Sequence, residues 1–80
     1  MASKAYVLIE ATIGRSREVA RAIRGVKEVT ESYIITGPYD IIAIVQGKDA
    51  DDVNAIVTTQ VHKIPGIART VTCLTIPVPR

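Results

Sequence analysis

Few side chains in this sequence are of the types that act as nucleophiles, proton carriers or metal ligands. It holds one histidine, His62, and one cysteine, Cys73. No partner stands at a fixed spacing from His62, which fits a surface residue favoured by the negative end of a helix dipole. Cys73 stands in an alternating stretch typical of a strand, where a lone cysteine is usually a small buried hydrophobe. We therefore expect no catalytic set, no metal centre and no cofactor, and hence no enzyme.

A basic flank lies along one stretch of helical periodicity. It consists of Arg15, Arg17, Arg21 and Arg24, with Lys27 nearby. Such a flank can contact phosphates. Three glutamates interrupt it, however, namely Glu18, Glu28 and Glu31, and the net charge of the chain is only +2. No recognition-helix pattern or basic arm accompanies it. We interpret the flank as a solvated, partly salt-bridged face and expect no direct contact with nucleic acid.

The stretch from Thr36 to Asp40 is the remaining candidate for a binding role. Gly37 and Pro38 are turn residues. Asp40 is harder to explain, because it opens a strongly apolar strand and alternates in line with Ile42. A carboxylate in that place must stay at the rim of the sheet or find a cation. Two interpretations stay open, an Asp that caps the turn and an Asp that contacts a ligand.

The periodicity of the apolar residues shows which elements position these side chains. Strand patterns cover residues 5–13, 26–36, 39–46 and 67–76, and helical patterns cover residues 15–24 and a second segment that Asp49 opens and Pro65 stops. The order β-α-β-β-α-β predicts an α+β, ferredoxin-like sandwich, with two helices on one face of a four-stranded antiparallel sheet. The alternation places Ala5, Val7, Ile9, Ala11 and Ile13 on one side of the first strand. We expect residues 1–80 to form a single domain.

The predicted sheet is apolar on both faces. The third strand contains Ile41-Ile42-Ala43-Ile44-Val45, and Val71 and Cys73 stand opposite Leu74 and Ile76 in the fourth. An 80-residue domain has a marginal core. A single cysteine also rules out an internal disulfide. Contiguous exposed apolar patches are rare in monomers. We therefore expect the open sheet face to be a self-complementary interface between copies of the chain.

The compartment is predicted from two absences in the sequence. No apolar run approaches the roughly 18 residues that span a membrane. The first residues, Met1-Ala2-Ser3-Lys4, lead straight into a strand pattern and do not form a signal peptide. We expect a cytoplasmic protein with a reduced thiol and no membrane partner.

Several short motifs stand in a characteristic order. They are Ala5-Tyr6-Val7-Leu8-Ile9, Gly14, Val26 with Val29, Thr36-Gly37-Pro38-Tyr39-Asp40-Ile41, Ile64-Pro65-Gly66-Ile67 and Arg69-Thr70-Val71-Thr72. Together they resemble the ligand-sensing (RAM) domain of the Lrp/AsnC family, the leucine-responsive and asparagine-operon regulators. The resemblance covers essentially the whole chain, and its implied fold is the sandwich predicted above.

The resemblance implies dimers formed through the sheets, which join into rings, commonly octamers, with amino-acid effectors in clefts between dimers. Gly37, Tyr39 and Asp40, with Pro38 among them, match the effector loop of the family, and Thr70 and Thr72 match positions that line the same cleft. The Asp40 carboxylate suits the ammonium of an amino acid. Backbone N–H groups and threonine hydroxyls suit its carboxylate.

One departure from the family pattern changes the expected function. Full-length members carry an N-terminal helix-turn-helix domain, whereas here the strand pattern begins within the first few residues. We expect a stand-alone effector-binding domain that modulates transcription regulation through a partner, such as a full-length Lrp/AsnC regulator. Two alternatives stay open, a purely structural oligomerisation partner and a small dimeric ferredoxin-like enzyme.

Overall fold

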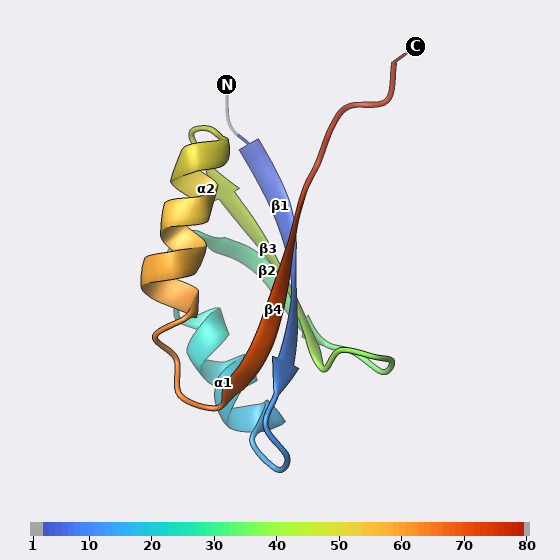
Figure 1. The fold of residues 1–80 in the computed structure, drawn as a ribbon, viewed down its shortest axis with the longest axis vertical. Helices are drawn as coiled ribbons and strands as arrows, with labels where there is room; N and C mark the ends of the chain where they lie inside the picture. Colours follow the sequence, from blue (N-terminus) through green and yellow to red (C-terminus); the bar gives the residue numbers. More distant parts are fainter. Residues whose placement is uncertain (1–2, 80) are drawn as a thin grey trace.

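The predicted β-α-β-β-α-β order is confirmed by the computed structural model, which describes residues 3–79. The elements are β1 (Ser3–Ala11), α1 (Ser16–Arg24), β2 (Val29–Ile34), β3 (Ile41–Gly47), α2 (Ala50–Ile56), a π-helical segment η1 (Val57–Val61) and β4 (Ile67–Leu74). The strands form one antiparallel sheet in the order β2-β3-β1-β4. Both helices cover the same face of that sheet, as the fold class requires (Figure 1).

The hydrophobic core lies between the sheet and the helices. Ala5, Val7 and Ile9 of β1 face the helices and are fully buried, as their alternation predicted. The other members are Val19, Ile23, Ile41, Ala43, Val45, Val53, Ile56, Val57, Val61 and Ile64. Burial of one such Val or Ile side chain contributes about 1.5–3 kcal/mol. This layer fixes the positions of the strand ends and turns that carry the candidate site.

The first two predicted strands have different bounds in the structure: β1 lies earlier in the chain than the predicted 5–13, and β2 is shorter than the predicted 26–36. The first strand ends at Ala11, and Ile13, expected on the inward face, is fully exposed in the following turn. Its pairing with β4 shifts after Glu10, and the N–H of Thr12 then bonds to the Gly66 carbonyl at 2.8 Å. The second strand begins at Val29 and not at residue 26, because a turn intervenes in which the Val29 N–H bonds to the Val26 carbonyl at 3.1 Å.

The second helical segment begins as predicted but changes its winding. Asp49 caps it by accepting a hydrogen bond from the Asp52 N–H at 2.8 Å. From Val57 the segment is π-helical, and the His62 N–H bonds to the Val57 carbonyl at 2.9 Å. The apolar stripe through Val53 and Val61 is buried as expected. A π-helical turn was not predicted, and such turns occur frequently at functional sites.

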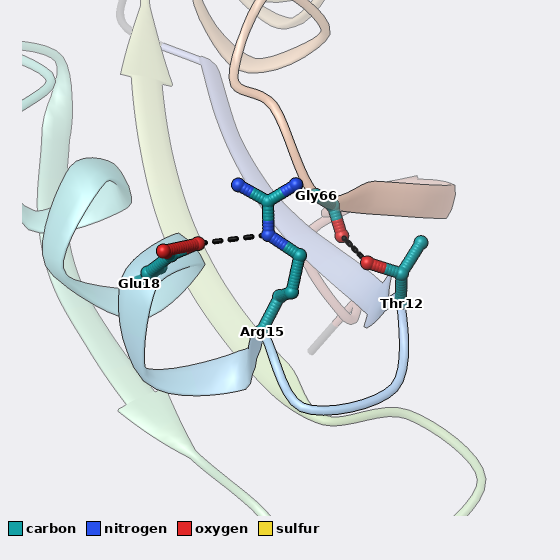
Figure 2. A network of polar contacts seen from close by, with 4 residues as sticks. All are labelled: Thr12, Arg15, Glu18 and Gly66. Carbon is teal, nitrogen blue, oxygen red and sulfur yellow. Dashed lines mark hydrogen bonds and ion pairs between the residues drawn. The ribbon is translucent and has the colours of Figure 1, made fainter.

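Two loops at one end of the molecule are fastened to each other (Figure 2). The Thr12 hydroxyl donates to the Gly66 carbonyl at 3.3 Å. Beside them, Arg15 Nε donates to a Glu18 carboxylate oxygen at 2.8 Å across the first turn of α1. These contacts hold the start of α1 against the loop that leads into β4.

Candidate functional site

The turn between β2 and β3 extends away from the helices (Figure 1). It spans residues 35–40, and the Ile35 N–H bonds to the Asp40 carbonyl at 2.8 Å across its base. Gly37 and Pro38 are exposed at its tip, where Gly37 has a φ of +144°. A positive φ of this kind favours glycine, which is why the turn can form here.

Asp40 is bound at the rim of the sheet. Its Oδ2 accepts a hydrogen bond from the Ala11 N–H at 2.8 Å, and its own N–H donates to the Ile9 carbonyl at 2.9 Å. The carboxylate is thus satisfied by a backbone donor and not by a cation. Among residues 3–79, no side chain donates a hydrogen bond to this carboxylate, so its Oδ1 is left as an acceptor. The carboxylate therefore does not cap its own turn but holds the end of β1, and it still leaves an oxygen for a ligand.

Tyr39 reaches across the end of β1 to β4. The Arg69 guanidinium lies 5.4 Å from the centre of the Tyr39 ring, and Arg69 Nη2 donates to the Tyr39 hydroxyl at 3.3 Å. Arg69 also pairs with Glu10 at 3.4 Å. Stacking of a guanidinium on an aromatic ring restrains both side chains. The sequence motif contained Arg69, but nothing in its spacing singled it out as a site residue.

Thr70 and Thr72 lie on the other face of the sheet, toward the helices. They pair across the sheet with Ile9 and Val7, whose side chains point into the core. Thr70 Oγ1 lies 2.9 Å from Nε2 of His62, just beyond the π-helical segment. The sequence alone gives His62 no partner, because only the fold brings residues 62 and 70 together.

A shallow hollow of about 380 Å³ lies beside this pair. It is lined by His62, Ile67, Ala68, Arg69 and Thr70. Within one chain, therefore, the six predicted residues form two groups on opposite faces of the sheet: the turn 37–40 on the outer side, and the two threonines under α2. Neither group alone surrounds a small molecule.

The outer face of the sheet is apolar, as predicted. The pairing of residues between β1 and its two neighbouring strands places six residues on this face, namely Tyr6, Leu8, Ile42, Ile44, Val71 and Cys73. Val71 is 36% exposed. Cys73 is exposed too, so the expectation of a buried cysteine is wrong for the single chain. Among the residues that the structure describes, no group of His, Cys, Asp and Glu is arranged to hold a metal ion.

Comparison with known families gives a match along nearly the whole chain. The model of the Lrp/AsnC ligand binding domain matches residues 4–79. The HTH-type transcriptional regulator FL11 of Pyrococcus abyssi is 30% identical over 70 residues, which are 88% of this chain and 46% of the regulator. The chain thus spans about half the length of the curated relatives it matches.

Solved structures share the fold. TTHA0845 from Thermus thermophilus has a TM-score of 0.88 and 35% identity, covering 98% of this chain and 99% of that one. AsnC of E. coli has a TM-score of 0.88 at 22% identity, covering 98% and 53%. A transcriptional regulator from Neisseria meningitidis, solved as a complex with L-Met, has a TM-score of 0.82 at 17% identity, covering 94% and 50%. Within residues 3–79, no helix is long and apolar enough to cross a membrane.

Proposed function

The chain belongs to the family of Lrp/AsnC ligand binding domains, and on this premise we propose that it binds an amino-acid effector between copies of itself. The observation that carries the proposal is the geometry of Asp40. Its carboxylate is fixed by the Ala11 N–H through one oxygen and offers the other at the base of the turn. A carboxylate held in this way is ready to accept a hydrogen bond from an ammonium group, which is a strong, charge-assisted contact.

The second half of the proposed site comes from another chain. A ligand carboxylate needs donors, and the hydroxyls of Thr70 and Thr72 are of the right kind. Because these threonines and the turn 37–40 lie on opposite faces of one sheet, we propose that the turn of one chain meets the threonines of a neighbour. Pro38 and Tyr39 would line the same cleft.

Assembly of the chain follows from its outer sheet face. An exposed apolar surface over three strands is unfavourable in a monomer. We propose that two chains pack these faces together in a two-fold dimer, and that dimers join into a higher oligomer such as an octameric ring. The outer face carries the dimer contact, and the clefts between dimers hold the effector.

The proposed biological role is regulatory. The curated relatives are transcriptional regulators, and a neighbour with this fold was solved with L-Met. We propose that the chain modulates a partner regulator in the cytoplasm and not that it binds DNA or catalyses a reaction. The hydroxyl, carboxylate and guanidinium groups brought together at the turn suit the recognition of a charged ligand.

Calorimetric titration with each of the twenty amino acids tests the effector proposal. We expect heat with at least one of them, and an affinity at least about tenfold lower in Asp40→Asn, because the variant loses the charge that meets the ammonium. Asp51→Asn removes the same charge from an exposed site at the start of α2 and should leave the affinity unchanged. If no amino acid gives heat while the oligomer is intact, the chain is an assembly partner and not a sensor.

A mixing experiment tests the division of the site between chains. Thr70→Val keeps the shape of the side chain and removes its hydroxyl, so we expect it to weaken binding as Asp40→Asn does. After co-refolding of the two variants, some clefts combine an intact Asp40 with an intact Thr70 from different chains. Recovery of binding supports a shared cleft; no recovery would place both groups within one chain and contradict the proposal.

A further inference from the structure

His62 lies next to a threonine of the proposed cleft. Its Nε2 stands 2.9 Å from Oγ1 of Thr70, and both side chains line the same hollow of about 380 Å³. His62 is exposed to solvent, whereas Thr70 is partly buried. The pair therefore joins a group that exchanges protons with water to a hydroxyl that would face the ligand.

The backbone holds His62 in this place. Its N–H bonds to the carbonyl of Val57, five residues back, at 2.9 Å. An α-helix would bond it to the residue four back, and the additional residue turns the chain beyond it by roughly 100°. On either side of His62, Val61 and Ile64 are buried in the core, and the Ile64 N–H bonds to the Val61 carbonyl at 3.1 Å. The imidazole is thus presented to β4 by a backbone that packing and hydrogen bonds fix.

Two arrangements of the hydrogen atoms fit the distance between His62 and Thr70. The Thr70 hydroxyl carries one hydrogen. An unprotonated Nε2 accepts that hydrogen, so that Thr70 has none left to donate to a ligand carboxylate. A protonated Nε2, which is present in one neutral tautomer and always in the imidazolium, donates to Oγ1 and leaves the hydroxyl hydrogen free. The state of His62 therefore decides whether Thr70 can act as the donor that the proposed cleft needs.

Strand β4 contributes one charged group to this hollow, Arg69. Its guanidinium stacks on Tyr39 and pairs with Glu10 at 3.4 Å. No Asp or Glu within residues 3–79 lines the hollow. An imidazolium at His62 therefore has no carboxylate partner in its own hollow, and the carboxylate of a ligand would supply one.

The cations on the helical segments around His62 have other surroundings. Lys63 lines a separate hollow between the ends of α1 and η1. Arg15, which approaches Gly66 in the loop after His62, pairs with Glu18 at 2.8 Å. A histidine ordinarily changes its charge between about pH 5 and 8. His62 is thus placed to add a positive charge beside Thr70 as pH falls.

We propose that His62 is a positioning residue of the effector cleft and makes effector binding depend on pH, because an imidazolium that donates to Thr70 frees the threonine hydroxyl for the ligand carboxylate. This inference rests on the proposed function. The imidazolium also brings a positive charge to the side of the cleft that receives the ligand carboxylate. Binding is therefore tightest at acidic pH and weakens as pH rises through the range in which histidine loses its proton.

Calorimetric titration of the intact oligomer with the twenty amino acids, at about pH 5.5 and about pH 7.5, tests this inference on either side of the histidine range. For an amino acid that binds, we expect an affinity at least about fivefold lower at the higher pH, because a charge-assisted contact is lost. Equal affinities at the two pH values would overturn the inference and leave the effector proposal standing. The absence of heat at both would overturn the effector proposal and the inference with it.

Two substitutions fix the state of residue 62. His62→Gln supplies a neutral donor at every pH, so its affinity should be the same at both pH values and close to that of the wild type at the higher one. His62→Lys supplies a lasting positive charge and should bind at both as tightly as the wild type does at the lower one. Lys63→Gln removes a charge outside the hollow and should keep the pH dependence. If His62→Gln keeps it as well, another group is responsible and the inference is wrong.

Thr70→Val separates an action through Thr70 from a direct contact of His62 with the ligand. We expect this variant to bind weakly at both pH values, with little difference between them. A full pH effect in Thr70→Val would mean that the imidazolium itself contacts the ligand, which contradicts the positioning role.

Nitrogen-15 NMR tests the contact without any ligand. His62 is the only histidine of the chain, so the imidazole signals need no assignment. In the free protein at neutral pH, Thr70→Val should shift the Nε2 signal, because the nitrogen loses its partner at 2.9 Å. Addition of the bound amino acid to the wild type should move the same signal toward the protonated, donating form. An unchanged Nε2 signal in Thr70→Val would overturn the inference whether or not an amino acid binds.

Discussion

The Asp40 carboxylate accepts a hydrogen bond of 2.8 Å from the Ala11 N–H, which ties the start of β3 to the end of β1. The same residue donates its own N–H to the Ile9 carbonyl at 2.9 Å. One oxygen of the side chain therefore has a structural partner, and the other is open. The structural contact with β1 and the proposed ligand contact therefore use different oxygens of Asp40, and substitutions can measure them one at a time.

Asp40→Ala should destabilise the fold more than Asp40→Asn does. The alanine leaves the partly buried Ala11 N–H without an acceptor, at a cost of about 1–3 kcal/mol, whereas the asparagine amide oxygen can replace the lost carboxylate oxygen. Chemical denaturation followed by circular dichroism gives both free energies of unfolding. Equal losses in the two variants would show that this hydrogen bond contributes nothing to stability.

Val71→Arg should dissociate the proposed dimer. Val71 is 36% exposed on the outer sheet face, where a charge would have to be buried between two chains. Leu74, which is 42% exposed on the opposite face of the same strand, provides the control, because Leu74→Arg places the same charge outside the contact. Analytical ultracentrifugation should show a smaller species for Val71→Arg alone. An unchanged sedimentation coefficient in Val71→Arg would exclude the outer face as the interface.

The Cys73 thiol offers a second measurement of the same contact. It is exposed on the outer face of the single chain, opposite Tyr6. Packing of two outer faces would cover it, so we expect slow alkylation in the wild type and fast alkylation in Val71→Arg. Equal rates at a concentration where the wild type is oligomeric would contradict burial of this face.

Gly66→Ala should cost more stability than Gly14→Ala. Both glycines have a positive φ, +98° and +82°, so each substitution carries a backbone penalty of about 1–2 kcal/mol. A Cβ on Gly66 would also lie 3.0 Å from Cγ2 of the fully buried Val19, whereas nothing lies within 4 Å of a Cβ on Gly14. We expect an additional loss of about 1–3 kcal/mol at residue 66 from this overpacking. Thermal unfolding of the two variants measures the difference.

The fold was predictable because its periodicities are unambiguous. Alternation in β1 identified Ala5, Val7 and Ile9 as core residues, and a helical stripe identified Val53 and Val61. The errors lie where a local pattern competes with tertiary contacts. Ile13 continues the alternation of β1 in the sequence. In the structure, however, the strand ends at Ala11, the Thr12 N–H bonds to the Gly66 carbonyl, and Ile13 lies exposed in the turn that follows.

The candidate site was predictable in its composition and not in its arrangement. The motif around Asp40 indicated a binding turn, but its bond to the Ala11 N–H depends on the pairing of distant strands. His62, which contacts Thr70, directly follows the π-helical segment, and no period in the sequence signals that segment. Arg69 contacts Tyr39 only because β4 lies beside β1.

Tyr33 should lose its proton at a pH above the ordinary range of a tyrosine. The hydrogen bond that its hydroxyl donates to Glu31, together with the negative charge of that carboxylate, raises the pKa of Tyr33 above its usual value of 10.0. A raised pKa means that the folded chain holds this proton more tightly than the unfolded chain. The stability from the pair is therefore present below pH 10.0 and lost as pH rises through the raised pKa.

Ultraviolet titration of the tyrosines measures this shift, and Tyr33→Phe identifies the signal by removing it. We expect Glu31→Gln to bring the pKa of Tyr33 back toward 10.0, because the amide carries no charge. Glu28→Gln, a neighbouring change without a bond to Tyr33, should leave the curve as it is. Superimposable curves for Glu31→Gln and the wild type would show that Glu31 does not stay with Tyr33 on the outer face.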